Sequence, residues 1–180
     1  AVVWFYQNAS QFDIDTSRMA IGGHSAGGNL AAVTCLRAVR ENAPFRFKVQ
    51  ILDYPPLDLS RCSFDKFIHP MGIPPQIAIM FDACYISPED MKNPSVSPAV
   101  LDPSDLTDLP PAVVLTAEFD SLRDEAELYA SKLIAAGVPV WCRRFLGSPH
   151  GFTMTLGGND IMGMPEDKNA AAGCRMMIDG

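Results

Sequence analysis

The residue of this 180-residue chain best suited to chemistry is a serine that lies between closely spaced glycines. Ser25 stands in Gly23-His24-Ser25-Ala26-Gly27, which fits the G-x-S-x-G pattern of a nucleophilic serine on a sharp turn between a strand and a helix. At both flanking glycines, Gly23 and Gly27, we expect a side chain to clash with the adjacent strand or helix. Ser25 is therefore the predicted nucleophile.

A serine hydroxyl needs an adjacent base, and the chain offers three histidines. His24 neighbours Ser25 in sequence, so its ring should point away from the hydroxyl, and we expect packing or a contact on the substrate side. His69 lies in a proline-rich stretch and is expected at the surface or in a lid. His150 follows an apolar segment on a loop that also contains Gly151, and it is the predicted base.

The third group of such a triad is an acid that orients the histidine, and it follows the serine and precedes the histidine in chains with this pattern. Asp120 comes just after an apolar segment at 112–117, at the sheet edge where sites of open α/β sheets form. Glu118 is its nearest competitor. We expect Asp124 and Glu125 to be first-turn acids that stabilise a helix dipole. Three other acids are expected in a solvated loop: Asp102, Asp105 and Asp108.

Four strands are needed to position these residues, and the apolar patterning predicts them at 18–23, 47–52, 112–117 and 138–146. Helices are expected between them and at the end of the chain. One runs over 26–40, one begins at a capping box formed by Ser121 and Asp124 and ends at Gly137, and the last covers about 165–178. The helix at 26–40 is expected to bury the stripe Leu30, Val33, Leu36 and Val39. The prediction is an α/β fold with about four parallel strands and flanking helices.

Residues 55–110 differ from the rest because they are rich in proline and lack strand signals. A stretch of this length is typical of a lid or insertion within the single domain expected for residues 1–180. Short helices are expected at 76–84 and 88–92. Six apolar residues could either line a pocket or form the insertion's own core: Met71, Ile73, Ile77, Ile79, Met80 and Phe81.

The composition of the chain excludes several classes of function. The net charge of −7, without a cluster of Lys and Arg, argues against a nucleic-acid partner. No apolar run approaches the roughly 18 residues of a membrane span, and the N-terminal residues do not resemble a signal peptide. Five scattered cysteines without a C-x-x-C pair predict reduced thiols in a cytoplasmic protein, with no metal site. No cofactor is expected, and the oligomeric state does not follow from these features.

Three segments in order resemble a known family: GHSAGGNL at 23–30, DSLRDE at 120–125 and HGF at 150–152. They are similar to motifs of the hormone-sensitive-lipase-like carboxylesterases (bacterial family IV, α/β-hydrolase fold-3). SP at 97–98 and LPPA at 109–112 also resemble segments of those enzymes. His24 stands where the family most often has Asp, and Ser121 where it most often has Pro. The resemblance covers essentially the whole chain.

The resemblance implies an α/β-hydrolase that cleaves small carboxylic esters with short acyl chains beneath a lid. It implies Ser25 as nucleophile, Asp120 as acid, His150 as base, and the Ala26 N–H as one donor of the oxyanion hole. An amidase or peptidase with the same triad is one alternative. A non-catalytic binding protein on the same scaffold is another.

One feature of the family is missing. Its HGGG-type loop, which supplies the other oxyanion donors, lies well upstream of the serine, and the residues before Ser25 contain no such motif. The chain is therefore expected to be the C-terminal portion of a longer esterase, with part of the lid absent and weak or no activity of its own. The strand at 18–23 should then have an unpaired edge that promotes aggregation.

Overall fold

The computed structural model describes residues 1–158 and 164–179, and its centre is a parallel sheet. The strands are β1 (Ile21–His24), β2 (Gln50–Asp53), β3 (Ala112–Ala117) and β4 (Val140–Phe145). They pair in the order β1-β2-β3-β4, with His24 opposite Asp53 and Asp53 opposite Leu115. All carboxyl ends therefore lie at one edge of the sheet, as the sequence predicted.

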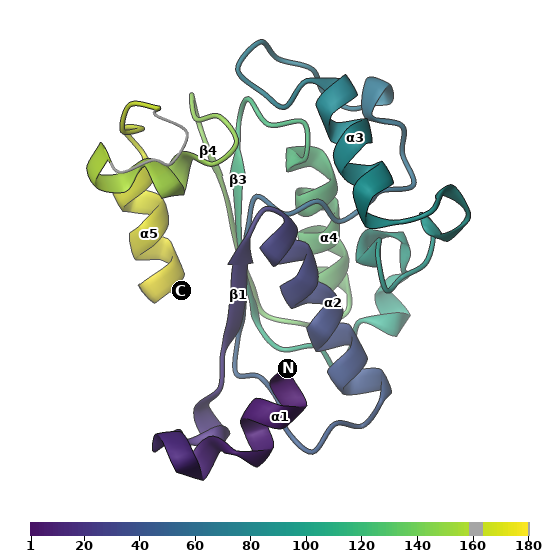
Figure 1. Cartoon of the computed structure of the whole chain (residues 1–180), viewed down its shortest axis with the longest axis vertical. Coiled ribbons are helices and arrows are strands. Elements are labelled where there is room, and N and C mark those ends of the chain that lie inside the picture. The colour runs from purple at the N-terminus through teal and green to yellow at the C-terminus, as the bar shows by residue number, and fades with distance from the viewer. Residues whose placement is uncertain (159–163, 180) are drawn as a thin grey trace.

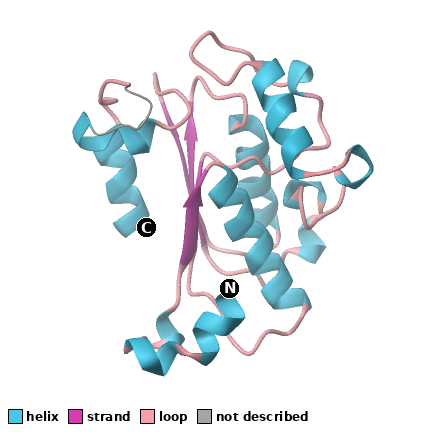
Figure 2. Cartoon of the chain, in the orientation of Figure 1, coloured by secondary structure: helices cyan, strands magenta, loops and turns pink. Residues whose placement is uncertain are grey.

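Helices cover both faces of the sheet (Figures 1 and 2). The helices are α1 (Val2–Gln7), α2 (Ala26–Arg40), α3 (Pro75–Tyr85), α4 (Arg123–Ala135) and α5 (Ala170–Asp179). Shorter 3₁₀ turns occupy Ala9–Phe12, Thr16–Arg18, Ser63–Asp65, Pro88–Asp90, Pro98–Val100, Pro103–Asp105 and Phe152–Gly158. Helices α2 and α4 pack on one face of the sheet, and α5 packs on the other (Figure 1). The predicted α/β fold, with four parallel strands and flanking helices, is confirmed.

The larger core lies between α2, α4 and the sheet, and it corrects one detail of the prediction. Helix α2 has the predicted bounds, but Leu30 is 54% exposed. Small residues such as Ala31, Ala32 and Cys35 face the core instead, which lets α2 lie close to the sheet. The second core, around Val113 and Leu115, is covered by α5.

Several element boundaries differ from the expected ones for local reasons. β1 begins only at Ile21, because residues 16–18 form a 3₁₀ turn whose start is capped by the Asp15 carboxylate. The predicted capping box at Ser121 is wrong. Helix α4 starts at Arg123, and the Leu122 N–H donates to the Asp120 carboxylate at 3.1 Å instead. Helix α5 starts at 170 rather than at about 165.

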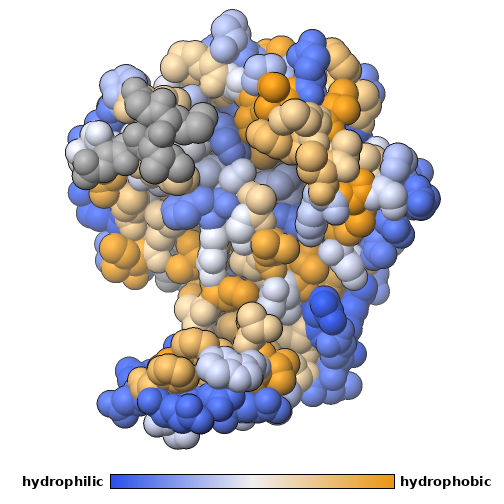
Figure 3. Space-filling model, in the orientation of Figure 1, coloured by the Kyte–Doolittle hydropathy of each residue, from blue (hydrophilic) through white to orange (hydrophobic). Residues whose placement is uncertain are grey.

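The segment between β2 and β3 contains no strand among the described residues, and α3 is its longest helix. No residue of α3 is buried, so the apolar residues of this helix do not form a separate core for the segment. Five of the six candidates are 40–56% exposed: Met71, Ile77, Ile79, Met80 and Phe81. Figure 3 shows the resulting apolar surface over α3. No helix in the described part of the chain is long and apolar enough to cross a membrane.

Candidate active site

Ser25 occupies the turn between β1 and α2 in a backbone conformation that L-residues rarely adopt, with φ +52° and ψ −122°. The Ser25 N–H donates to the Asp53 carbonyl at 2.8 Å, which ties the turn to β2. A Cβ at Gly23 would lie only 2.3 Å from the Gly27 carbonyl carbon, so a side chain is excluded there, as predicted. At Gly27 the prediction is wrong, because a Cβ would meet no atom within 4 Å.

The three residues expected to act together are connected by hydrogen bonds. The Ser25 Oγ lies 2.9 Å from His150 Nε2, and His150 Nδ1 lies 2.7 Å from Asp120 Oδ2. Asp120 is fully buried, whereas the His150 side chain is 18% exposed. With Nδ1–H donating to the buried carboxylate, His150 Nε2 presents a lone pair to the serine hydroxyl. This arrangement can remove the proton from Ser25 during nucleophilic attack.

Two loops at the carboxyl edge of the sheet hold this geometry. The Glu118 carboxylate accepts from the Gly147 N–H at 2.6 Å, and the Phe119 N–H donates to the Ser148 carbonyl at 3.0 Å. Glu118 therefore anchors the loop that leads to His150 and does not replace Asp120. Asn169, just before α5, donates to the Ser148 hydroxyl at 2.8 Å.

The other two histidines lie where the sequence indicated. His69 is half-buried, and its ring stacks on Phe119 with a centroid distance of 4.0 Å. The ring of His24 is directed away from the serine, and its Nδ1 lies 2.7 Å from Asp53 Oδ2. Neither is within hydrogen-bond distance of Ser25 Oγ in the described residues.

A group of polar residues beneath the site was missed from the sequence. Asp53 is fully buried, and the hydroxyls of Tyr54 and Thr153 lie 2.9 Å apart beside it. The rings of Tyr54 and His150 pack in a T-shaped arrangement at a centroid distance of 4.7 Å. Asp53 is the last residue of the apolar strand β2 and Tyr54 follows it, so the carboxyl-edge rule that selected Asp120 would also have found them.

Glu125 lies in the first turn of α4, as expected, and it also forms a buried ion pair that the sequence did not indicate. Its side chain is 2% exposed and pairs with Lys66 Nζ at 2.6 Å. Its other oxygen accepts from the Leu57 and Asp58 N–H groups. Burial raises the pKa of Glu125 to about 7, and Lys66 opposes that shift. This acid holds the segment after β2 against α4.

Ala26 is the first residue of α2, and its N–H has no acceptor within the helix because the first helical amides lack one. The partial positive charge at this end favours an anion beside Ser25. Among residues 1–158 and 164–179, no three His, Cys, Asp or Glu side chains are grouped so that they could hold a metal ion.

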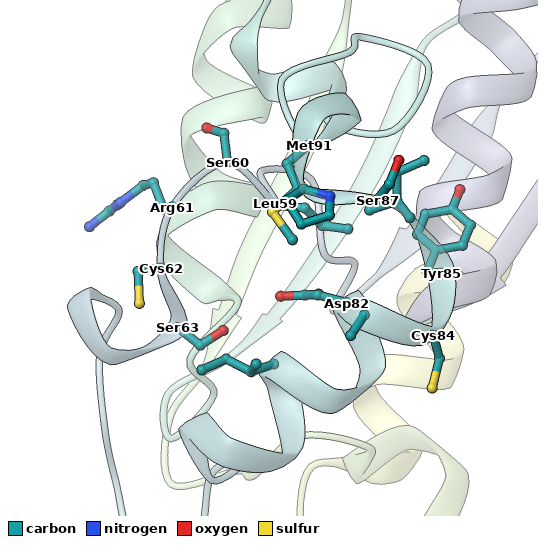
Figure 4. Close-up of a pocket in the computed structure, with 14 residues that line it drawn as sticks. Leu59, Ser60, Arg61, Cys62, Ser63, Asp82, Cys84, Tyr85, Ser87 and Met91 are labelled. Carbon is teal, nitrogen blue, oxygen red and sulfur yellow. The ribbon is translucent and has the colours of Figure 1, made fainter.

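A cavity of about 710 Å³ lies between residues 59–63 and the C-terminal half of α3 (Figure 4). Ile79 and Met91 are among its apolar lining residues, and Ser63 and Asp82 contribute polar atoms. None of the three triad candidates lines this cavity. Of the six apolar residues expected to line a pocket, Ile79 alone contributes to it.

Comparison with known proteins places this geometry in a family. A family model described as "alpha/beta hydrolase fold" matches residues 1–154. An arylesterase from Saccharolobus solfataricus is 36% identical over 154 residues, which are 84% of this chain and 50% of that protein. The carboxylesterase NlhH of Mycobacterium tuberculosis is 38% identical over 144 residues, 78% of this chain and 45% of its own length.

Solved structures agree with these sequence relatives. A thermostable esterase from Pseudomonas putida superposes with a TM-score of 0.83 at 31% identity, over 97% of this chain and 54% of the esterase. The chain thus spans about half the length of the curated relatives that it matches. The resemblance to hormone-sensitive-lipase-like carboxylesterases is confirmed, and the chain belongs to the alpha/beta hydrolase fold family.

Proposed function

We propose that this chain carries the catalytic triad of a serine carboxylesterase, with Ser25 as nucleophile, His150 as general base and Asp120 as the orienting acid. The observation that carries the proposal is the continuous hydrogen-bonded path from Ser25 Oγ through His150 to Asp120 Oδ2. Esterases among the relatives support carboxylic esters as the substrate class. A non-catalytic binding protein would have no need of this complete path.

In the proposed reaction the Ser25 Oγ attacks the ester carbonyl carbon while His150 Nε2 takes the hydroxyl proton. The resulting oxyanion accepts a hydrogen bond from the Ala26 N–H. The intermediate expels the alcohol, which receives the proton from His150, and leaves an acyl group on Ser25. Water, deprotonated by His150, then releases the carboxylic acid and restores the serine. Asp120 keeps its negative charge and stabilises the imidazolium.

We propose that the substrates are small esters with short acyl chains rather than amides. An amide has a poorer leaving group than an ester, and no described subsite beside Ser25 is dedicated to a peptide. We propose a cytoplasmic enzyme on the basis of its scattered cysteines. The sequence contains no HGGG-type motif, so Ala26 is the only identified donor. Because losing a single donor typically costs roughly 10²–10³-fold in rate, we expect turnover to be lower than that of an esterase with a full oxyanion hole by at least this factor.

Substitution of Ser25 tests the proposal. A fluorophosphonate probe reports a nucleophilic serine even where turnover is slow, so we expect covalent labelling of the chain and its loss in Ser25→Ala. Ser95→Ala is the matched control, because Ser95 is exposed and lies outside the triad. The circular dichroism spectra of both variants should match that of the parent chain. Labelling that persists in Ser25→Ala would reject the assignment.

The ester preference has its own measurement. We expect p-nitrophenyl acetate to be hydrolysed and the corresponding p-nitroanilide to be hydrolysed far more slowly, with both rates abolished in Ser25→Ala. Equal rates on the two compounds would favour an amidase.

A further inference from the structure

Asp53 at the end of β2 holds both sides of the serine turn. Its carbonyl accepts from the Ser25 N–H at 2.8 Å, and its Oδ2 lies 2.7 Å from His24 Nδ1. The two side chains meet because His24 and Asp53 are partners in the register of β1 and β2. One fully buried residue therefore fixes the residue before the nucleophile and the nucleophile's own amide.

Tyr54 connects this pair to the other side of the site. Its hydroxyl lies 3.2 Å from His24 Nδ1 and 2.9 Å from the Thr153 hydroxyl, which in turn donates to Asp53 Oδ2. Its backbone has φ +39°, a strained value for a residue with a side chain, and is held by its N–H bond to Leu115 O at 2.8 Å. Tyr54 is 1% exposed, and its ring packs against the ring of His150 in a T-shaped arrangement.

We propose that Asp53 and His24 form an accessory carboxylate–imidazole pair that positions the catalytic serine and, through Tyr54 and Thr153, the ring of His150. The inference rests on the proposed function of Ser25 and His150. Asp53 and His24 are positioning residues, because they contact the turn and the neighbours of the base rather than the reacting atoms. Their geometry is separate from the Asp120–His150 contact, which uses a different strand.

The charges around the pair favour an ionised His24. The hydrogen bond that His24 donates to Asp53 raises the pKa of His24 above its usual 6.5, and burial raises the pKa of Asp53. The titratable and polar groups that face Asp53 come from four directions: His24 on β1, Tyr54 after β2, His150 and Thr153 on the loop after β4, and Cys174 on α5. Asp120 also acts on Tyr54 electrostatically.

The raised pKa of His24 makes the stability of the folded chain depend on pH. Its contribution to stability is complete below pH 6.5 and is lost as pH rises through the value in the folded state. Asp53 Oδ1 has no hydrogen-bond partner among the described residues, so the hydrogen bonds to this buried carboxylate are at Oδ2, from the Thr153 hydroxyl and from His24, which is its cationic partner. Loss of the imidazole should leave a buried carboxylate unpaired.

NMR tests the pair without relying on turnover. The chain has three histidines, so their Cε1–H signals can be assigned with His24→Asn. In the parent chain we expect the His24 signal to titrate above 6.5, and in Asp53→Asn its midpoint should fall. An unchanged His24 midpoint in Asp53→Asn would overturn the pairing, whatever the result at Ser25.

Fluorophosphonate labelling tests positioning. We expect His24→Ala to slow labelling roughly 10²-fold, as expected for a misplacement of about 1 Å. His24→Asn should restore most of the rate, since its amide N–H can replace Nδ1–H toward Asp53. Asp53→Asn should also slow labelling, because it removes the carboxylate that holds His24 beside the serine turn.

Lys66→Met is the matched control for a merely structural loss. It breaks a buried ion pair that does not contact Asp53, so it should lower stability and leave both the labelling rate and the NMR midpoint of His24 unchanged. The inference fails if His24→Ala labels at the parent rate, or if the NMR midpoint of His24 in Asp53→Asn equals that of the parent chain. If Asp53→Asn does not fold, the comparison of His24→Ala with His24→Asn decides. If the parent chain shows no labelling that depends on Ser25, the proposed function is rejected. The NMR titration would still test whether His24 and Asp53 are paired.

Discussion

At the scale of single residues, Gly23 and Gly27 flank the same serine in different surroundings. The space for a Cβ at Gly23 is occupied by the backbone of Gly27, at 2.3–2.9 Å. Gly27 itself lies on the open side of the first turn of α2. The close approach of β1 to α2 therefore requires glycine at one of these positions only.

This difference gives a paired prediction. Gly23→Ala should push α2 away from β1, lower the melting temperature and abolish fluorophosphonate labelling of Ser25. Gly27→Ala should fold as well as the parent chain or gain about 0.4–1 kcal/mol, because alanine restricts the unfolded chain. Differential scanning fluorimetry with labelling measures both effects. Equal destabilisation by the two substitutions would contradict the geometry.

At the scale of elements, the segment after β2 is attached to α4 by a buried ion pair. Lys66 Nζ lies 2.6 Å from Glu125 Oε2, and both side chains are at most 5% exposed. Lys66 also donates to the Asp58 carbonyl at 3.0 Å. Since α3 buries no residue, these contacts are important for holding the segment to the rest of the fold.

Removing one partner tests this attachment. Lys66→Ala leaves the Glu125 carboxylate buried without its cation, and we expect a loss of about 3–5 kcal/mol of unfolding free energy. Urea denaturation followed by circular dichroism gives the value. Arg37→Ala is the control, because the Arg37–Glu41 pair is more than 60% exposed and should contribute less than about 1 kcal/mol. Similar losses of unfolding free energy in the two variants would contradict this attachment.

At the scale of the molecule, β1 is an edge strand of the described sheet, and it borders the triad. An unpaired edge can add a strand from a second chain. Exposed aromatic rings of Trp4, Phe5 and Phe12 contact one another near the start of the chain, at centroid distances of 5.6–6.4 Å. The predicted tendency to associate should therefore be centred on this side of the sheet.

A charge at the edge should reduce that association. Ala20 is exposed and immediately precedes β1, so Ala20→Lys should lower the concentration-dependent sedimentation coefficient without changing the circular dichroism spectrum. Ile178→Lys is the control, since Ile178 is 81% exposed on α5 and on another part of the surface. Association that responds equally to both variants would show that the β1 edge is not responsible.

The sequence by itself determined the order of elements and the three triad candidates. Local rules suffice for these, because a glycine-flanked serine, an acid and a histidine after apolar strands must meet where parallel strands end. It could not determine which neighbours fill the space around each residue. The open position at Gly27, the outward turn of Leu30 and the burial of Glu125 depend on contacts between distant segments.

The tertiary structure alone decided how His24 is used. Beside Ser25 in sequence it could have been a packing residue or a contact with substrate. Strand register placed it opposite Asp53, and the loop after β4 brought Thr153 to the same carboxylate. Pairings of this kind join residues up to 129 positions apart, as for His24 and Thr153, so no local pattern encodes them.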